Sequence, residues 1–238
     1  MNAKHNQPLP EWEHVLSAAA RLQTLLPEAV LVGGTASAIH AAHRFSRDAD
    51  HVLVDLRQRF DEILGELESV AGWKTARVQR PVLILGSLDG IETGVRQLIR
   101  AQPLETMEIQ ASGARICIPT LAEILRIKGV LILKRNATRD YLDFVALASK
   151  MSPPDIAAAL ASFDALYPQP NGQSALQQLH IQLAQPLPYD LEETQLSEYK
   201  NLAAQWHDWH AVQKVCTQVS TQLFDQLSST PAREAPQL

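Results

Sequence analysis

The chain has 238 residues, of which 46% are hydrophobic and 20% charged, a composition that excludes disordered and collagen-like proteins. It has neither an apolar run near the roughly 20 residues of a membrane helix nor a signal-peptide core in its polar start, so we predict a cytoplasmic protein with no membrane partner. The net charge of -5 argues against coating of nucleic acid by bulk attraction. Cys117 and Cys216 lack partners at zinc-ligand spacing and are expected to be reduced thiols.

The first third of the chain mixes helical and strand patterns. Apolar residues recur at helical spacing up to Pro27, and a short apolar run then leads into a glycine pair. An alanine-rich stretch follows, and after it polar and apolar residues alternate as in a strand. The expected elements are a helix over 11–26, a strand over 30–32, a helix over 35–42, a strand over 48–56 and a helix over 56–70.

The rest of the chain changes from strands to helices. Short β-prone pieces at 82–85, 91–98, 107–109 and 114–118 complete a sheet. Thr120 and Glu123 have the spacing of a capping box, in which each side chain satisfies a backbone donor of the first turn. Further helices are expected over 120–134, 139–150, 156–166 and 199–227, with 167–191 partly loop. We therefore predict a core at 1–118, a helical domain at 119–228 and a disordered tail at 229–238.

Gly33 and Gly34 stand between a predicted strand and a predicted helix. Two glycines there let the backbone approach a ligand closely and present amides at the positive helix end, where phosphates bind. A tight turn without a ligand is the alternative interpretation of this pair taken alone.

Asp48 and Asp50 lie one residue apart on a predicted strand, so both side chains point to the same face. Two adjacent carboxylates repel each other unless a cation neutralises them, and their hard oxygen atoms suit Mg²⁺ together with substrate phosphates. A solvated strand edge is the alternative. The preceding glycine pair favours the metal site.

Two later features carry charge on helices. Lys128 continues an apolar stripe and should face the packed side of its helix, where it would meet a triphosphate or the carboxylate pair; the alternative is a lysine that snorkels to the surface. Asp140 and Asp143 share a helix face, although Asp140 could simply favour its own helix start. The basic residues between Arg126 and Arg139 form either a local groove for RNA or a solvated helix end.

Together these motifs resemble the nucleotidyltransferase AbiEii/AbiGii toxin family, within the DNA polymerase β-like nucleotidyltransferase superfamily. The resemblance spans about 31–147 and rests on Gly33-Gly34-Thr35-Ala36, on His43-Arg44-Phe45-Ser46-Arg47-Asp48-Ala49-Asp50, on Lys128, and on Arg139-Asp140-Tyr141-Leu142-Asp143. It implies an α+β fold, in which a mixed sheet flanked by helices is followed by a helical C-terminal domain. The first two helices of that domain would complete the active site.

The resemblance also implies roles for individual residues. Asp48 and Asp50 would bind the metal, Gly33 and Gly34 would cradle a triphosphate, and Asp140 would be the essential acid of the last motif. Glu92 is the candidate for the third metal carboxylate that the superfamily often has, and His51 stands where an apolar residue is expected. The other expected nucleotide-binding residues are Thr35, Arg47, Lys128, Arg139 and Asp143.

The implied activity is transfer of a nucleotide from an NTP, with Mg²⁺ as cofactor, to a hydroxyl of RNA, tRNA included, or of a protein. Relatives of this kind are toxins of toxin-antitoxin or phage-defence systems, so a cognate antitoxin is an expected partner. The alternative is a catalytically silent member that binds nucleotide as a sensor or regulatory module. A small-molecule modifier is a third interpretation, for which the sequence offers no identifiable acceptor pocket.

Overall fold

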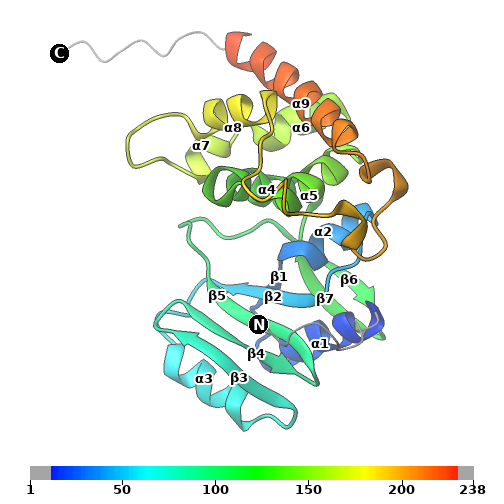
Figure 1. Ribbon diagram of the computed structural model, residues 1–238. Helices are drawn as coiled ribbons and strands as arrows, with labels where there is room; N and C mark the ends of the chain where they lie inside the picture. The colour runs from blue at the N-terminus through cyan, green and yellow to red at the C-terminus, as the bar shows by residue number, and fades with distance from the viewer. Residues whose placement is uncertain (1–11, 230–238) are drawn as a thin grey trace, which may run out of the picture. The chain divides into compact units, whose positions relative to one another are not determined.

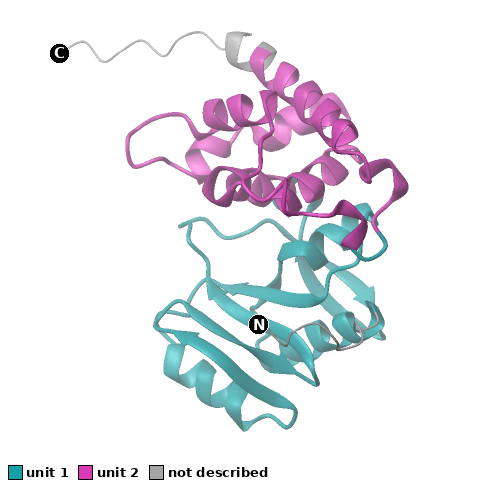
Figure 2. Ribbon diagram, in the orientation of Figure 1, with its two compact units in different colours: residues 1–124, 199–201 teal, residues 125–198, 202–238 magenta. Residues whose placement is uncertain are grey.

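The computed structural model describes residues 12–229, which form two compact units. Of the described residues, 12–124 and 199–201 belong to the first unit, and 125–198 and 202–229 belong to the second (Figure 2). The boundary predicted from the sequence, 118/119, falls at the end of the last strand of the first unit. Of the expected disordered tail 229–238, only Ser229 lies within the described residues, where it ends a helix.

The first unit is built on a mixed sheet of order β1-β2-β5-β4-β3 (Figure 1). Its β2 and β5 strands are parallel, and the other neighbours are antiparallel. The strands are β1 (Val30–Leu31), β2 (Asp48–Leu53), β3 (Trp73–Gln79), β4 (Leu83–Leu88) and β5 (Ile91–Gln97).

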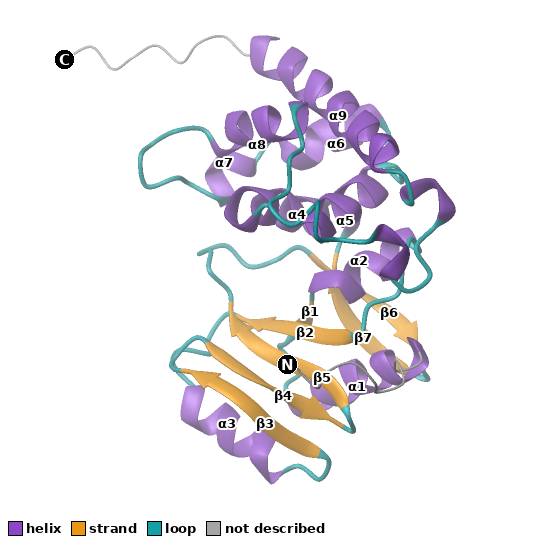
Figure 3. Cartoon of the chain, viewed as in Figure 1, coloured by secondary structure: helices purple, strands orange, loops and turns teal. Residues whose placement is uncertain are grey.

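Helices α1 (Trp12–Leu25) and α3 (Phe60–Ser69) contribute to one apolar core with the sheet. Leu22 of α1 and Ile63 of α3 are both fully buried in this cluster, together with Ile84 and Val95 from the strands. Burial of large aliphatic side chains drives this packing, at about 1.5–3 kcal/mol for each side chain. The expected mixed sheet flanked by helices is confirmed (Figure 3).

A separate two-stranded hairpin, β6 (Thr106–Ala111) and β7 (Ala114–Pro119), completes the strands described in this unit. Gln23 of α1 exchanges two hydrogen bonds with the backbone of Cys117, at 2.8 Å and 2.7 Å. The side-chain amide of Gln23 therefore bonds to the N–H and C=O of Cys117 on β7, as the backbone of a neighbouring strand would. Both cysteines are free thiols, as expected.

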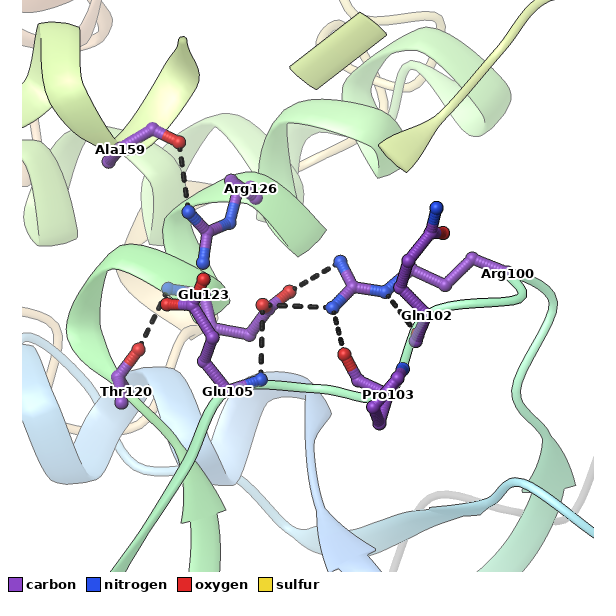
Figure 4. A network of polar contacts seen from close by, with 8 residues as sticks. All are labelled: Arg100, Gln102, Pro103, Glu105, Thr120, Glu123, Arg126 and Ala159. Atoms are coloured by element: carbon purple, nitrogen blue, oxygen red, sulfur yellow. Dashed lines mark hydrogen bonds and ion pairs between the residues drawn. The ribbon is translucent and has the colours of Figure 1, made fainter. Parts of the chain in front are cut away.

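The start of α4 (Leu121–Arg135) differs from the predicted capping box. Thr120 Oγ1 accepts a bond from Glu123 N, but the N–H of Thr120 donates to Glu105 O instead of to Glu123. The Glu123 carboxylate binds Arg100 in a buried two-pronged pair at 2.8 Å and 2.9 Å (Figure 4). A long-range partner has thus replaced half of a local motif, and it anchors the loop after β5.

The second unit is helical. Beyond α4 it contains α5 (Thr138–Ala148), α6 (Pro153–Leu160), α7 (Phe163–Leu166), α8 (Ala175–Ala184) and α9 (Trp209–Ser229), with 3-10 turns η1 (Leu196–Glu198) and η2 (Ala204–Trp206). Within the described residues, no helix is long and apolar enough to cross a membrane.

The predicted helix over 199–227 is wrong in its first ten residues. Asn201 has a positive φ of 53°, which interrupts a helix, and the Asp208 carboxylate accepts a bond from His210 N at 2.9 Å. This local cap starts the helix at Trp209 rather than at Tyr199. The region 167–191, expected to be partly loop, contains α8, which begins after the capping residue Ser174.

Candidate active site

The two predicted metal ligands, Asp48 and Asp50, are at the start of β2. Both are half-buried and alternate with buried Ala49 and His51, so they share one face of the strand, as predicted. Because Ala49 and His51 face the opposite side, burial of that side fixes the register that presents the carboxylates. Local alternation is therefore enough to place this pair.

The opposite side of β2 holds His51, which is fully buried. Backbone groups of Ala49 and Ala19 lie near its ring, but neither ring nitrogen makes a hydrogen bond of standard geometry. Loss of hydration lowers the pKa of His51 to about 4. The ring is therefore neutral at pH 7 and fills the position where an apolar residue was expected.

Gly33 and Gly34 begin α2 (Gly33–Ala41), rather than preceding it as predicted. Gly33 has a φ of 72°, and a Cβ there would lie 3.6 Å from Asp50 Cβ. The residue before it, Val32, offers no side-chain cap, and its N–H donates to Asp50 O at 2.8 Å. The uncapped amino end of α2 thus begins beside the second carboxylate, which suits a phosphate bound near a metal.

Gly34 is required for a different reason, namely a close approach. A Cβ on it would lie 2.6 Å from Arg44 Nη2 and 2.8 Å from Ser46 Oγ, so any larger residue would have to displace these two side chains. Ser46 Oγ in turn donates to Asp48 Oδ1 at 2.6 Å. The helix start, the Arg44 guanidinium and the first carboxylate therefore form one continuous set of contacts.

Arg44 and Ser46 belong to the motif that carries the family resemblance, but the sequence predicts no role for them at the site. Both are buried, whereas the predicted nucleotide-binding residue Arg47 is exposed. Positions 44, 46, 48 and 50 are all polar, but β2 and its alternation begin only at Asp48, so the pattern gives no face for the first two. Thr35, another predicted nucleotide-binding residue, is fully buried and its hydroxyl donates to Asp48 O, so its side chain supports β2.

Charges next to Asp50 come from β5. Arg96 Nε lies 4.0 Å from Asp50 Oδ1, at the limit of an ion pair. Glu92 pairs in register with Asp48 and is exposed. Across the described residues, no group of three or more His, Cys, Asp or Glu side chains is arranged to hold a metal ion. The third carboxylate at Glu92 stays a prediction.

The helical unit holds a second charged cluster, built from Lys128 on α4 and from Asp140 and Asp143 on α5. Lys128 Nζ lies 2.6 Å from Asp143 Oδ2 and 3.5 Å from Asp140 Oδ1. Arg135 also binds Asp140, through Nη2 at 2.7 Å and through Nε. Lys128 is 1% exposed and both acids are fully buried, so the predicted packed position is confirmed and the snorkelling alternative is wrong.

The basic run around Lys128 is divided by burial. Arg126 and Lys128 are buried, and Arg126 Nη1 donates to Ala159 O at 3.1 Å. Lys134, Arg135 and Arg139 are exposed. An RNA groove along the whole run is therefore excluded, because its first two cations serve the interior of the helical unit.

Several known proteins match most of the chain. The sequence model described as "Nucleotidyl transferase AbiEii toxin, Type IV TA system" matches residues 14–227. The solved structure of an H. pylori protein assigned as a nucleotidyltransferase aligns with a TM-score of 0.56 and 17% identity, over 91% of this chain and 95% of that one. At this identity the structural match shows a shared fold.

Among curated relatives, "Heme uptake protein MmpL11" of Mycobacterium tuberculosis is 29% identical over 92% of this chain and 23% of that protein. "Mycolic acid-containing lipids exporter MmpL11" of Mycolicibacterium smegmatis is 36% identical over 53% of this chain and 13% of that protein. The chain thus spans about a quarter or less of the length of these curated relatives.

Proposed function

The chain belongs to the nucleotidyl transferase AbiEii toxin family, and on this premise we propose that it transfers a nucleotide from an NTP, with Mg²⁺, to a hydroxyl of an acceptor. The proposed acceptor is RNA, tRNA included, or a protein. We also propose a cognate antitoxin as partner and the cytoplasm as location. The family's membership in type IV toxin-antitoxin systems supports the antitoxin.

The observation that carries the proposal is the position of Gly33 against Asp50. Backbone amides at the start of a helix bind phosphate, and paired carboxylates bind a cation that phosphate also ligates. A Cβ on Gly33 would lie 3.8 Å from Asp50 Oδ2, so the two halves of such a site adjoin within one unit. A tight turn without a ligand would not need to start against an acidic pair.

The donor set fits Mg²⁺, with Asp48 and Asp50 as carboxylate ligands and phosphate and water oxygens in the remaining positions. The ion would stabilise negative charge on the transferred phosphoryl group and on the leaving group. Ser46 holds Asp48 Oδ1, which fixes the orientation of one carboxylate. The first amides of α2 and the Arg44 guanidinium would bind the triphosphate.

In the proposed reaction the acceptor oxygen attacks the α-phosphorus in line with the bond to the β-phosphate. A new P–O bond forms, the α–β bridging bond breaks, and pyrophosphate leaves while the hydroxyl proton passes to solvent. Lys128, Asp140, Asp143 and Arg139 stay predicted contributors. Because the first three compensate one another's charges, variants of these residues test folding as well as function.

The test is incubation with each labelled NTP, Mg²⁺ and total tRNA. Wild type is expected to label an acceptor, and Asp48→Asn, which removes a half-exposed charge with little change in shape, is expected to abolish labelling. Asp61→Asn on α3 is the matched control, since its side chain is 81% exposed. Equal labelling by wild type and Asp48→Asn would contradict the proposal.

A silent, nucleotide-binding member is the second candidate, favoured by the lack of a three-acid metal group among the described residues. Glu92→Gln distinguishes an active enzyme, in which Glu92 supplies the third metal carboxylate, from a silent member without one. If Glu92 completes the site, the variant loses labelling but keeps its fold. Metal-dependent NTP binding by wild type, with no label transferred to tRNA or to protein, would favour the silent member.

A further inference from the structure

Three residues late in the chain, Tyr199–Asn201, group with the first unit although residues on both sides group with the second. They form the turn between η1 and η2. Figure 2 shows this short segment in the colour of the core unit. We call this segment, Tyr199–Asn201, the strap.

The strap contacts the loop between α2 and β2, at residues 42–47. Phe45 N–H donates to Lys200 O at 2.8 Å. The Arg44 guanidinium lies over the Tyr199 ring, 5.6 Å from its centre, in a cation–π contact. Asn201 closes the turn with a φ of 53°, a conformation that β-branched residues avoid.

The same loop is held on its other side by α1. The rings of Trp12 and Phe45 stack at 5.2 Å with an angle of 11° between their planes. The Phe45 side chain thus packs on α1 while its backbone pairs with the strap. A loop outside regular secondary structure has gained two long-range anchors, which is expected where a loop positions functional groups on a rigid scaffold.

The anchored residues are those that contact the candidate site. Arg44 and Ser46 flank Phe45 and together abut Gly34, and Ser46 Oγ binds Asp48 Oδ1 at 2.6 Å. A shift of Phe45 would therefore move the guanidinium at the start of α2 and the hydroxyl that orients the first carboxylate. The strap is not part of the sheet, whose strands pair only with one another. Its contacts therefore bear on the loop and not on the sheet.

We propose that Tyr199–Asn201 is a positioning strap, which fixes the loop at 42–47 so that Arg44 and Ser46 keep their places at the nucleotide site. Its effect on nucleotide binding rests on the function proposed above. Its hold on the loop does not. The strap residues act through Arg44 and Ser46 and would contact neither metal nor nucleotide.

Two pairs of full-length variants test the strap. Tyr199→Leu removes the ring beneath Arg44, while Tyr199→Phe keeps it. Asn201→Val opposes the positive φ, while Asn201→Gly permits it. In each pair the first variant should loosen the loop and the second should behave as wild type.

The first readout is amide hydrogen exchange, which needs no ligand. Peptides covering 42–48 are expected to exchange about three- to tenfold faster in Tyr199→Leu and Asn201→Val, as loss of a contact of about 1 kcal/mol predicts. Peptides covering the α9 core at 212–223 should be unchanged, which excludes general unfolding. Unchanged exchange at 42–48 in both disrupting variants would overturn the proposal.

The second readout is binding of Mg²⁺ with each non-hydrolysable NTP analogue, measured by calorimetry. The disrupting variants should bind about three- to tenfold more weakly, and the conservative variants as wild type does. Faster exchange with unchanged affinity would overturn the positioning role. If wild type binds no analogue, the proposed function fails, and the exchange data alone decide whether the strap holds the loop.

Discussion

Two acidic groups in this molecule differ in how their charge is balanced. Asp140 and Asp143 are fully buried and contact two cations from the same unit, Lys128 and Arg135. Asp48 and Asp50 are half-buried and reach solvent, and Arg96 Nε lies 4.0 Å from Asp50 Oδ1. The first group is sealed inside the helical unit with its cations, whereas the second is open to solvent, from which a metal ion can reach it. Residue type alone does not make a metal site.

The largest expected effect is on the buried cluster. Lys128→Met should lower the free energy of unfolding by about 3–5 kcal/mol, because it removes the ammonium that lies 2.6 Å from buried Asp143 and 3.5 Å from buried Asp140. Urea unfolding measures it, with Lys134→Met on the exposed side of the same helix as control. The double variant Lys128→Met/Asp143→Leu should regain part of the loss. A loss from Lys128→Met no larger than that of the control would contradict internal compensation.

The next effect concerns His51, whose folded-state pKa of about 4 lies below its usual 6.5. As pH falls the unfolded state takes up the proton first, so this contribution to stability is complete above pH 6.5 and is lost toward pH 4. The loss amounts to about 3 kcal/mol. Unfolding of wild type and His51→Leu over this range tests it, and the same pH dependence in both would refute the assignment.

A smaller effect on stability is expected when either of two helical glycines, Gly34 of α2 or Gly65 of α3, is replaced by alanine. Gly34→Ala should cost about 1–3 kcal/mol, since its Cβ would force Arg44 and Ser46 apart from α2. Gly65→Ala on α3 should stabilise by about 0.5–1 kcal/mol, since its Cβ would meet nothing within 4 Å. Thermal unfolding compares them. A neutral Gly34→Ala would show that the close approach at α2 is not required.

The smallest expected effect concerns Ser46, which orients Asp48 through one hydrogen bond. Ser46→Ala should raise the Mg²⁺ concentration needed for NTP binding about fivefold, as loss of roughly 1 kcal/mol predicts. Ser69→Ala on α3, whose hydroxyl bonds only within its own helix turn in the described contacts, is the control. A Mg²⁺ dependence equal to wild type would remove Ser46 from the site.

Local patterns predicted much of this fold. Alternation around Asp48 and Asp50 placed both carboxylates on one face of a strand, and the apolar stripe placed Lys128 inside. Long-range contacts account for the errors. Glu123 binds Arg100 instead of completing its capping box, and Tyr199 belongs to a turn because its partner Arg44 lies on a distant loop. Neither contact has a signature in the nearby sequence.

The sequence predicts which residue types could form the candidate site, but it does not predict which neighbouring residues hold them in place. The glycine pair and the two aspartates can be proposed from residue type and spacing, and their binding of nucleotide and metal stays a prediction. Arg44 and Ser46 matter because of what they touch, which only the folded loop reveals. The sequence likewise does not show that Lys128 forms ion pairs with acids of the next helix, because that contact depends on how the two helices pack.

The proposed function depends on a metal-bound triphosphate at the carboxylate pair on β2. Crystals soaked with Mn²⁺ and a non-hydrolysable NTP analogue test it through the anomalous signal of the metal. We expect a manganese peak in contact with both Asp48 and Asp50, with phosphate oxygens at the first amides of α2. A manganese peak elsewhere, or a bound triphosphate away from Gly33, would contradict it.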